Sequence, residues 1–330
     1  MRQILHKQRP VETSNSRLSI SVLGFFALML ILLVSALVMR HQSTPESTVL
    51  TLNTKAEGTE ETSAFSRPAK AEPTYPSKLP ELAVAIRKRI DETEGVYSVR
   101  FESFSTQESF GINDELMMTA ASVIKIPILA ALYSRAKAGT IDLSDTMTIP
   151  LQDVQDWGTG TIRYQEPPLT YSLRELARLL MEKSDNTAAY VLTHRVIGQN
   201  ELQEMVEAWG LTGTNVKTND TTNKDMNKLL NLMRAGVIAG EMTDEMLGWM
   251  DDSDFEDRLP FLLPDDVTVY HKIGNEVRVV NDVGIIARDG KPEYYLGVMT
   301  AEIPDEAETK RAIAEISKMV YEYHFQVDSE

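Results

Sequence analysis

The residues of this sequence that could do chemistry begin with Ser122 and Lys125, within the segment from Ala120 to Gly139. Apolar residues recur at a helical period after Lys125, so the pattern predicts that Ser122 begins a helix and that the Lys125 amine lies close to its hydroxyl. A serine becomes a strong nucleophile when an adjacent base takes its proton, and apolar surroundings can lower the pKa of an amine enough for that task. The pair is therefore a candidate nucleophile and base, with backbone N–H groups at the helix start as candidate oxyanion donors. The structural alternative makes Ser122 a helix cap and Lys125 a solvated residue.

A second polar group, Ser184-Asp185-Asn186, lies between two amphipathic helical patterns. Ser and Asp are good N-caps, so one interpretation is that the tripeptide only starts the second helix. In the functional interpretation, the Ser184 hydroxyl passes a proton to a leaving nitrogen, and the Asn186 amide contacts Lys125 and the substrate. The sequence of this tripeptide alone leaves both interpretations open.

The third group is Lys272-Ile273-Gly274, at the end of an apolar, β-branched strand pattern. A lysine followed by glycine there can bring a positive charge to a carboxylate while the backbone comes close to a ligand. For the neighbouring His271 there are two interpretations, a residue that lines the site or a polar histidine at the end of a strand. The loop around Gly158-Thr159-Gly160 is likewise either part of the cleft rim or an ordinary loop.

The elements that must position these residues are helices in the middle of the chain and strands toward both ends. Period-two patterns and Asp289-Gly290 turn chemistry indicate an antiparallel sheet, and the helical patterns form a covering layer and an all-helical subdomain. The sequence therefore predicts an α+β fold. The expected strands are 97–104, 267–273, 279–288 and 293–301, and the expected helices are 79–94, 172–183, 186–197, 200–209, 223–235, 243–250 and 305–323.

The chain before this domain divides into three segments. Residues 1–17 are basic, and residues 18–39 are 22 residues without a charge, about 33 Å of helix, which predicts an uncleaved transmembrane signal anchor. Residues 40–77 are rich in Ser, Thr, Glu and Pro, which predicts a disordered linker. The positive charges place the N-terminus in the cytoplasm and the catalytic domain, 78–330, outside the cell membrane.

The composition excludes several other classes of function. A formal net charge of -16 argues against nucleic acid as a partner, and the absence of Cys removes disulfides and thiol chemistry. The five His residues show no metal-ligand spacing, so no metal is expected. We expect a monomeric catalytic domain that works without a cofactor on a small molecule or peptide.

S-x-x-K, S-D-N and K-x-G in this order are the motif set of class A β-lactamases and penicillin-binding proteins. From about residue 80 to 325 the chain resembles that superfamily; examples are TYSLRELARLLMEKSDNTAAYVL and VYHKIGNEVRVVNDVGII. The resemblance implies an acyl-enzyme on Ser122, with Lys125 as the acylation base, directly or through Ser184. It also implies an oxyanion site formed by the N–H groups of Ser122 and Asn275, and substrate binding by Asn186, Lys272 and Gly274.

Two departures from the family pattern matter. The Ω-loop that carries the deacylating glutamate of class A enzymes corresponds here to a short stretch, residues 210–220, without Glu or Asp before Asp220. Ile273 stands where the family usually has Thr or Ser, so carboxylate binding would rest on Lys272, with Arg278 as a possible second cation. The expected function is a membrane-anchored serine hydrolase acting on β-lactams or D-Ala-D-Ala peptidoglycan peptides. The alternative is a non-catalytic or slowly deacylating sensor of β-lactams or cell-wall fragments.

Overall fold

The computed structural model of the protein describes residues 78–251 and 253–326. The predicted basic segment, membrane anchor and linker, residues 1–77, lie outside the described residues. Within the described ranges, no helix is both long enough and apolar enough to cross a membrane.

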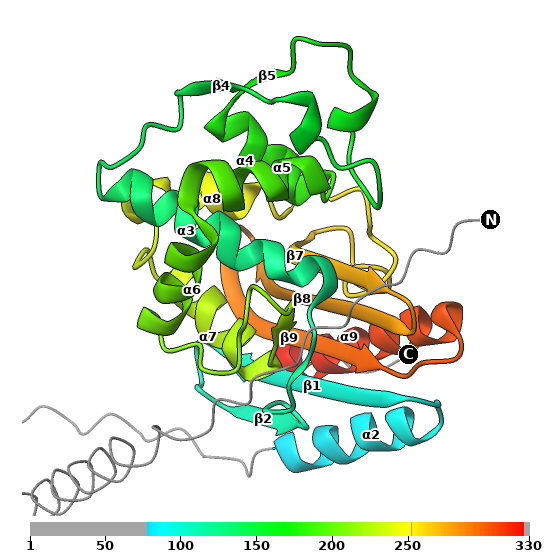
Figure 1. Ribbon diagram of the computed structural model, residues 1–330. Helices are drawn as coiled ribbons and strands as arrows, with labels where there is room; N and C mark the ends of the chain where they lie inside the picture. Colours follow the sequence, from blue (N-terminus) through cyan, green and yellow to red (C-terminus); the bar gives the residue numbers. More distant parts are fainter. Residues whose placement is uncertain (1–77, 252, 327–330) are drawn as a thin grey trace, which may run out of the picture. The chain divides into compact units, whose positions relative to one another are not determined.

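The centre of the fold is a five-stranded antiparallel sheet to which both ends of the domain contribute (Figure 1). Its last hairpin turns at Asp289-Gly290, where both residues have positive φ (52° and 72°), as the turn chemistry predicts. In pairing order the strands are β2 (Ser109–Ile112), β1 (Val96–Ser103), β9 (Lys291–Ala301), β8 (Val279–Arg288) and β7 (Val267–Glu276). The predicted strand at 267–273 therefore continues to Glu276, so Lys272, Gly274 and Asn275 all lie on strand β7.

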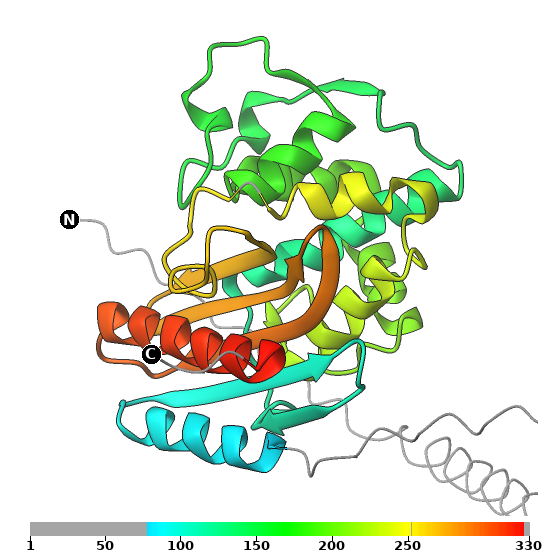
Figure 2. The same ribbon diagram turned by 180° about the vertical axis from the view of Figure 1, so that it is seen from behind.

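Two helices cover one face of the sheet, α2 (Leu79–Asp91) and α9 (Glu306–Phe325), seen in front of it in Figure 2. Their apolar residues, such as Ile86 and Ile313, pack with Val280 of the sheet into one hydrophobic core. α9 begins at Asp305, whose carboxylate accepts hydrogen bonds from two N–H groups of the first turn.

The opposite face of the sheet carries the helical part of the domain, whose core is continuous with that face (Figure 1). α3 is its central helix, because every side chain from Lys125 to Tyr133 is buried. The helices are α3 (Lys125–Lys137), α4 (Leu173–Glu182), α5 (Asn186–Val191), α6 (Gln199–Ala208), α7 (Asn223–Arg234) and α8 (Thr243–Gly248). Two short strand pairs accompany them, β3 (Met118–Thr119) with β6 (Asp220–Thr221) and β4 (Thr146–Thr148) with β5 (Thr170–Ser172).

The helix predicted over 186–197 is interrupted. α5 ends at Val191 and is followed by a π-helical turn, Leu192–Ile197, which stops at Gly198 with φ 94°. The Arg135 guanidinium donates to the carbonyl oxygens of Val196 and Ile197, which replaces the hydrogen bonds lost where the helix ends.

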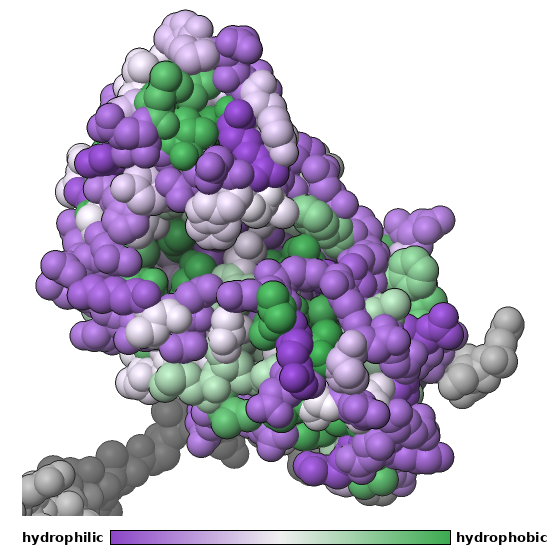
Figure 3. All heavy atoms as spheres, turned by 45° about the vertical axis from the view of Figure 1, so that its right-hand side comes forward, coloured by the Kyte–Doolittle hydropathy of each residue, from purple (hydrophilic) through white to green (hydrophobic). Residues whose placement is uncertain are grey.

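The predicted α+β class is confirmed: an antiparallel sheet lies between a pair of helices and a larger helical layer. On the face drawn in Figure 3, hydrophobic residues form small separate patches among hydrophilic ones. The two apolar cores lie inside the domain, and the polar residues buried there include Lys125, Ser184, Asp185 and Lys272.

Candidate active site

Ser122 lies at a junction between a strand and a helix. The residues before it are held by β3, which pairs with β6, and by the Ala120 N–H, which donates to the Asn219 carbonyl oxygen at 2.8 Å. Ala121 has φ 50°, a left-handed conformation that is unfavourable for alanine, and a 3-10 turn over Ala121–Ile124 follows before α3 begins. The surrounding hydrogen bonds thus hold a strained backbone that presents Ser122, which is only partly buried, at the start of a helix.

The Lys125 amine is buried and makes its hydrogen bonds across the cleft. Its Nζ donates to the Ser184 carbonyl oxygen at 2.5 Å, to Ser184 Oγ at 3.0 Å and to Asn186 Oδ1 at 2.8 Å. The structure thus brings Lys125, Ser184 and Asn186 together, although the sequence pattern pointed first to contact between Lys125 and the hydroxyl of Ser122. Burial, helped by the positive charge of Lys272, holds the pKa of Lys125 well below its usual value. A lowered pKa favours the neutral form of the amine, which is the form that a general base needs.

Asp185 holds the second motif to the rim of the cleft. Its carboxylate caps α5 by accepting from the Ala188 N–H at 3.0 Å, and it also accepts from the N–H groups of Thr161 and Ile162 at 2.6 and 2.9 Å. The capping interpretation and the functional one are therefore compatible, because Asp185 is the cap while its two neighbours contact Lys125.

The glycine-containing loop reaches the same place. The Asn186 amide donates to the Trp157 carbonyl oxygen at 3.2 Å, and Thr159 Oγ1 donates to the Ser184 carbonyl oxygen at 2.7 Å. A Cβ on Gly158 would lie 2.3 Å from Asn186 Nδ2, so only glycine permits this approach. The loop is thus part of the rim, one of the two interpretations that the sequence left open.

Strand β7 brings the third motif against the nucleophile. A Cβ on Gly274 would lie 2.5 Å from the Ala120 carbonyl oxygen and 3.3 Å from the Ser122 backbone nitrogen. Gly274 therefore allows β7 to pass directly beside Ser122, which brings the neighbouring Asn275 to the same edge of the site. This geometry suits an oxyanion site built from backbone N–H groups.

Lys272 lies on the same face of β7 as Gly274 and is almost completely buried, at 1% exposure. Among the described residues, no acceptor lies within hydrogen-bonding distance of its Nζ. Burial lowers the pKa of Lys272 to about 7, and the positive charge of Arg258 acts in the same direction, while the carboxylate of Asp282 opposes both. An unpaired buried amine of this kind is a site for an anionic group of a ligand.

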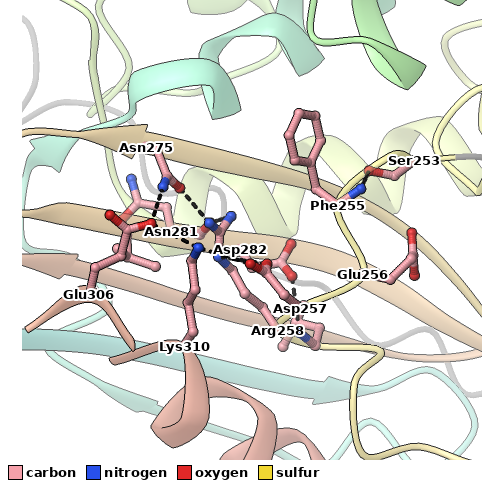
Figure 4. Close-up of polar contacts among 12 residues, drawn as sticks. Ser253, Phe255, Glu256, Asp257, Arg258, Asn275, Asn281, Asp282, Glu306 and Lys310 are labelled. Atoms are coloured by element: carbon pink, nitrogen blue, oxygen red, sulfur yellow. Dashed lines mark hydrogen bonds and ion pairs between the residues drawn. The ribbon is translucent and has the colours of Figure 1, made fainter. Parts of the chain in front are cut away.

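Arg258 is a residue that the sequence analysis missed. It belongs to the segment before β7, is 1% exposed, and donates to Asn275 Oδ1 at 2.5 Å (Figure 4). Arg278, the cation that the sequence suggested, instead donates to the Glu302 carbonyl oxygen at 2.8 Å. No helical or strand period marks the segment around Arg258, so only the three-dimensional path of the chain brings its guanidinium to β7.

The stretch that replaces the Ω-loop packs against the residues that lead to Ser122. It runs from Gly210 to β6, and its Asn219 carbonyl oxygen accepts the Ala120 N–H, two residues before Ser122. Asn219 Oδ1 is buried and has no hydrogen-bond partner among the described residues. At this position the chain presents an amide and not a carboxylate.

Residues 78–251 and 253–326 contain no group of three or more His, Cys, Asp or Glu that could hold a metal ion. The polar groups close to Ser122 are instead the Lys125 amine, the Ser184 hydroxyl and the Asn186 amide, with the buried Lys272 amine on the neighbouring strand β7.

Comparison with known proteins agrees with this geometry. The model of the β-lactamase enzyme family matches residues 81–324. The β-lactamase VEB-1 of Pseudomonas aeruginosa is 22% identical over 244 residues, which cover 66% of this chain and 82% of that enzyme. The solved structure of PBP-A is 26% identical, with a TM-score of 0.70, over 77% of this chain and all of PBP-A. A PBP-A mutant solved as an acyl-enzyme complex with penicillin G matches with 25% identity and the same TM-score and coverage of this chain. The chain therefore belongs to the β-lactamase enzyme family and is a serine hydrolase of the class A β-lactamase-like superfamily.

Proposed function

We propose that Ser122 is acylated by β-lactams and by peptidoglycan peptides that end in D-Ala-D-Ala, and that the acyl-enzyme is long-lived. Ser122 Oγ attacks the carbonyl carbon and its proton passes to Lys125. The bond between carbonyl carbon and leaving nitrogen then breaks, and that nitrogen takes the proton back from Lys125 through Ser184. Backbone N–H groups of Ser122 and Asn275 hold the oxyanion, while Lys272 binds the substrate carboxylate.

The observation that carries the proposal is the environment of Lys125. A buried amine with a depressed pKa contacts Ser184 Oγ and Asn186 Oδ1, and it lies one helical turn after a serine whose backbone nitrogen abuts β7. The three hydrogen-bond acceptors of the Lys125 amine are neutral oxygens, and the nearby Asp185 carboxylate opposes the lowering of its pKa without forming a hydrogen bond to it.

Slow deacylation follows from what borders Ser122. Hydrolysis of the ester needs a base that activates water, and the stretch from residue 210 to 219, which borders the approach to Ser122, contains no Glu or Asp. Similarity to PBP-A, a penicillin-binding protein by name, and to its mutant trapped with penicillin G supports the same conclusion. Similarity to the β-lactamase VEB-1 favours rapid hydrolysis instead, so turnover is the quantity to measure.

The test is intact-mass spectrometry of the soluble domain from residue 78, incubated with a penicillin, while hydrolysis of a chromogenic cephalosporin is followed by absorbance. We expect a stoichiometric adduct that persists for minutes to hours and is lost in Ser122→Ala. Rapid turnover without an adduct would replace the proposal by a β-lactamase with another base. If Ser122→Ala kept its full affinity for the drug, and wild type formed no adduct, the domain would be a binding module and the sensor alternative would stand.

We further propose that the uncharged segment 18–39 anchors the chain in the cell membrane with the catalytic domain outside. The 22 uncharged residues and the basic residues before them support this topology. Protease added to intact cells should release the domain by cutting within residues 40–77. A domain that stays intact until the cells are lysed would contradict the proposed orientation.

A further inference from the structure

A buried ion pair lies on the back of strand β7, on the face opposite Lys272 and Gly274. His271 Nδ1 is 2.8 Å from Asp282 Oδ1, and both side chains are fully buried. Gly284 lies beside His271 on β8, and a Cβ there would be 2.7 Å from His271 Cβ, so the glycine makes room for the imidazole. The mechanism proposed for Ser122 uses neither His271 nor Asp282.

The pair holds the segment that carries Arg258. His271 Nε2 is 3.3 Å from Glu256 Oε1, and Asp282 Oδ2 accepts the Leu259 N–H at 3.0 Å. Glu256 and Leu259 flank Arg258 in the sequence, so the segment is fixed on both sides of that residue. Figure 4 draws Glu256 and Arg258 of this segment together with Asp282.

Arg258 needs this support because its guanidinium is buried with few partners of its own. It donates to Asn275 Oδ1 at 2.5 Å, and its nearest carboxylate, Asp257, is 3.5 Å from Nε and half exposed. A buried cation so weakly paired is held mainly by the chain around it. Asp257 is in turn bound by Lys310 of α9 at 2.9 Å, which fixes the segment from the helix side (Figure 4).

The charge of His271 favours a lasting contact with its acidic neighbours at neutral pH. Burial alone would lower the pKa of His271, but the charge and hydrogen bond of Asp282, together with Glu256, raise it to about 9. The His271 imidazolium therefore bridges the side chains of Asp282 and Glu256.

We propose that His271 and Asp282 are positioning residues for the anion-binding half of the site. By holding Glu256 and Leu259 they keep Arg258 against Asn275, where its positive charge adds to the field of Lys272 and so favours an anionic substrate at the site. This inference rests on the proposed acylation of Ser122. It makes His271, which touches no substrate, a determinant of preference for anionic substrates.

The test compares a penicillin with its methyl ester, which lacks the negative charge but keeps the reactive carbonyl group. Second-order acylation rates are measured by intact mass on the full domain for wild type, His271→Gln and Glu256→Ala. Glu256→Ala is included because the Glu256 side chain is 52% exposed, so its loss should leave the domain folded even if His271→Gln does not fold. His324→Gln and Glu293→Ala are controls, since that pair is also a histidine beside a glutamate, 3.6 Å away and with the imidazole 9% exposed, but belongs to α9 and β9.

We expect His271→Gln and Glu256→Ala to slow acylation by the penicillin by about 10- to 100-fold and acylation by the ester by less than threefold. The two control variants should slow neither. In an Arg258→Ala background, His271→Gln should have little further effect, because its role passes through Arg258. Equal slowing of both substrates, or full additivity with Arg258→Ala, would overturn the inference and leave the proposed function intact. A wild-type protein that reacts with neither substrate would overturn both.

Discussion

The contact between β7 and the nucleophile can be tested by Gly274→Ala, which adds one methyl group at the point where the strand passes Ser122. That methyl would lie 2.5 Å from the Ala120 carbonyl oxygen and 3.2 Å from Ala121 Cβ, whereas ordinary contacts begin at 3.4 Å. Both obstacles belong to the backbone or to Cβ, so no side chain can rotate away. The strand and the 3-10 turn must therefore separate by about 0.9 Å at the oxyanion site.

A misplacement of about 1 Å can cost about 10²-fold in rate, so we expect the acylation rate of Gly274→Ala to fall by roughly two orders of magnitude. Overpacking should lower the free energy of unfolding by about 1–3 kcal/mol, which leaves a well-packed domain folded. The assay is the rate of penicillin adduct formation by intact mass, with urea unfolding of the same samples.

Gly248→Ala is the matched control, because nothing lies within 4 Å of a Cβ at that position. It should acylate like wild type and be equally or slightly more stable. Acylation of Gly274→Ala within threefold of wild type, with unchanged stability, would refute the close approach of β7 to Ser122.

Three further predictions follow from buried charges. Because the pKa of Lys272 is about 7, its positive charge is mostly present at pH 6 and mostly lost at pH 8. The acylation rate of a penicillin divided by that of its methyl ester should therefore fall by roughly tenfold from pH 6 to pH 8. A ratio that does not change with pH would exclude Lys272 as the anion site. The pKa of His271 is raised from 6.5 to about 9, so the stability that His271 contributes is complete below pH 6.5 and is lost as pH rises through 9. The difference in unfolding free energy between wild type and His271→Gln should accordingly shrink by about 3 kcal/mol from pH 6 to pH 10, as urea unfolding at both pH values can measure. Asp185→Ala leaves three backbone N–H groups without their acceptor and should cost about 2–4 kcal/mol of stability, seen as a lower urea midpoint with an unchanged slope.

The sequence predicted the parts of the fold that depend on local patterns. Period-two runs located β8 to the residue and β9 to within two residues, because both strands pack on apolar cores and end at a turn with its own chemistry. The motif residues Lys125, Ser184 and Asn186 were predicted to act together, and the structure does bring them into contact.

The rest depended on packing that no local pattern records. Spacing along a helix suggested that the Lys125 amine lies close to the Ser122 hydroxyl, but it could not give the hydrogen bonds of that amine to Ser184 and Asn186, which the fold supplies from another part of the chain. Arg258 was missed because its segment has no period, and Arg278 was suggested only because it is close to Lys272 in sequence. The hairpin turn directs Arg278 toward Glu302 instead.

The cations of the site act on one another, and this coupling links substrate binding to proton transfer. After burial, the largest influence that lowers the pKa of Lys125 is the positive charge of Lys272. A substrate carboxylate bound at Lys272 would neutralise much of that field, and the pKa of Lys125 should therefore rise in the complex. The Lys125 amine would then hold a proton less readily while the site is empty and become a stronger base once the carbonyl group is in place, when the proton of Ser122 has to be removed. With a penicillin, the acidic limb of the pH profile should consequently lie at higher pH for the maximal acylation rate than for the second-order acylation rate. With the methyl ester of that penicillin, the acidic limbs of the two rates should lie at the same pH. Coinciding limbs for the penicillin would show that the two amines titrate independently.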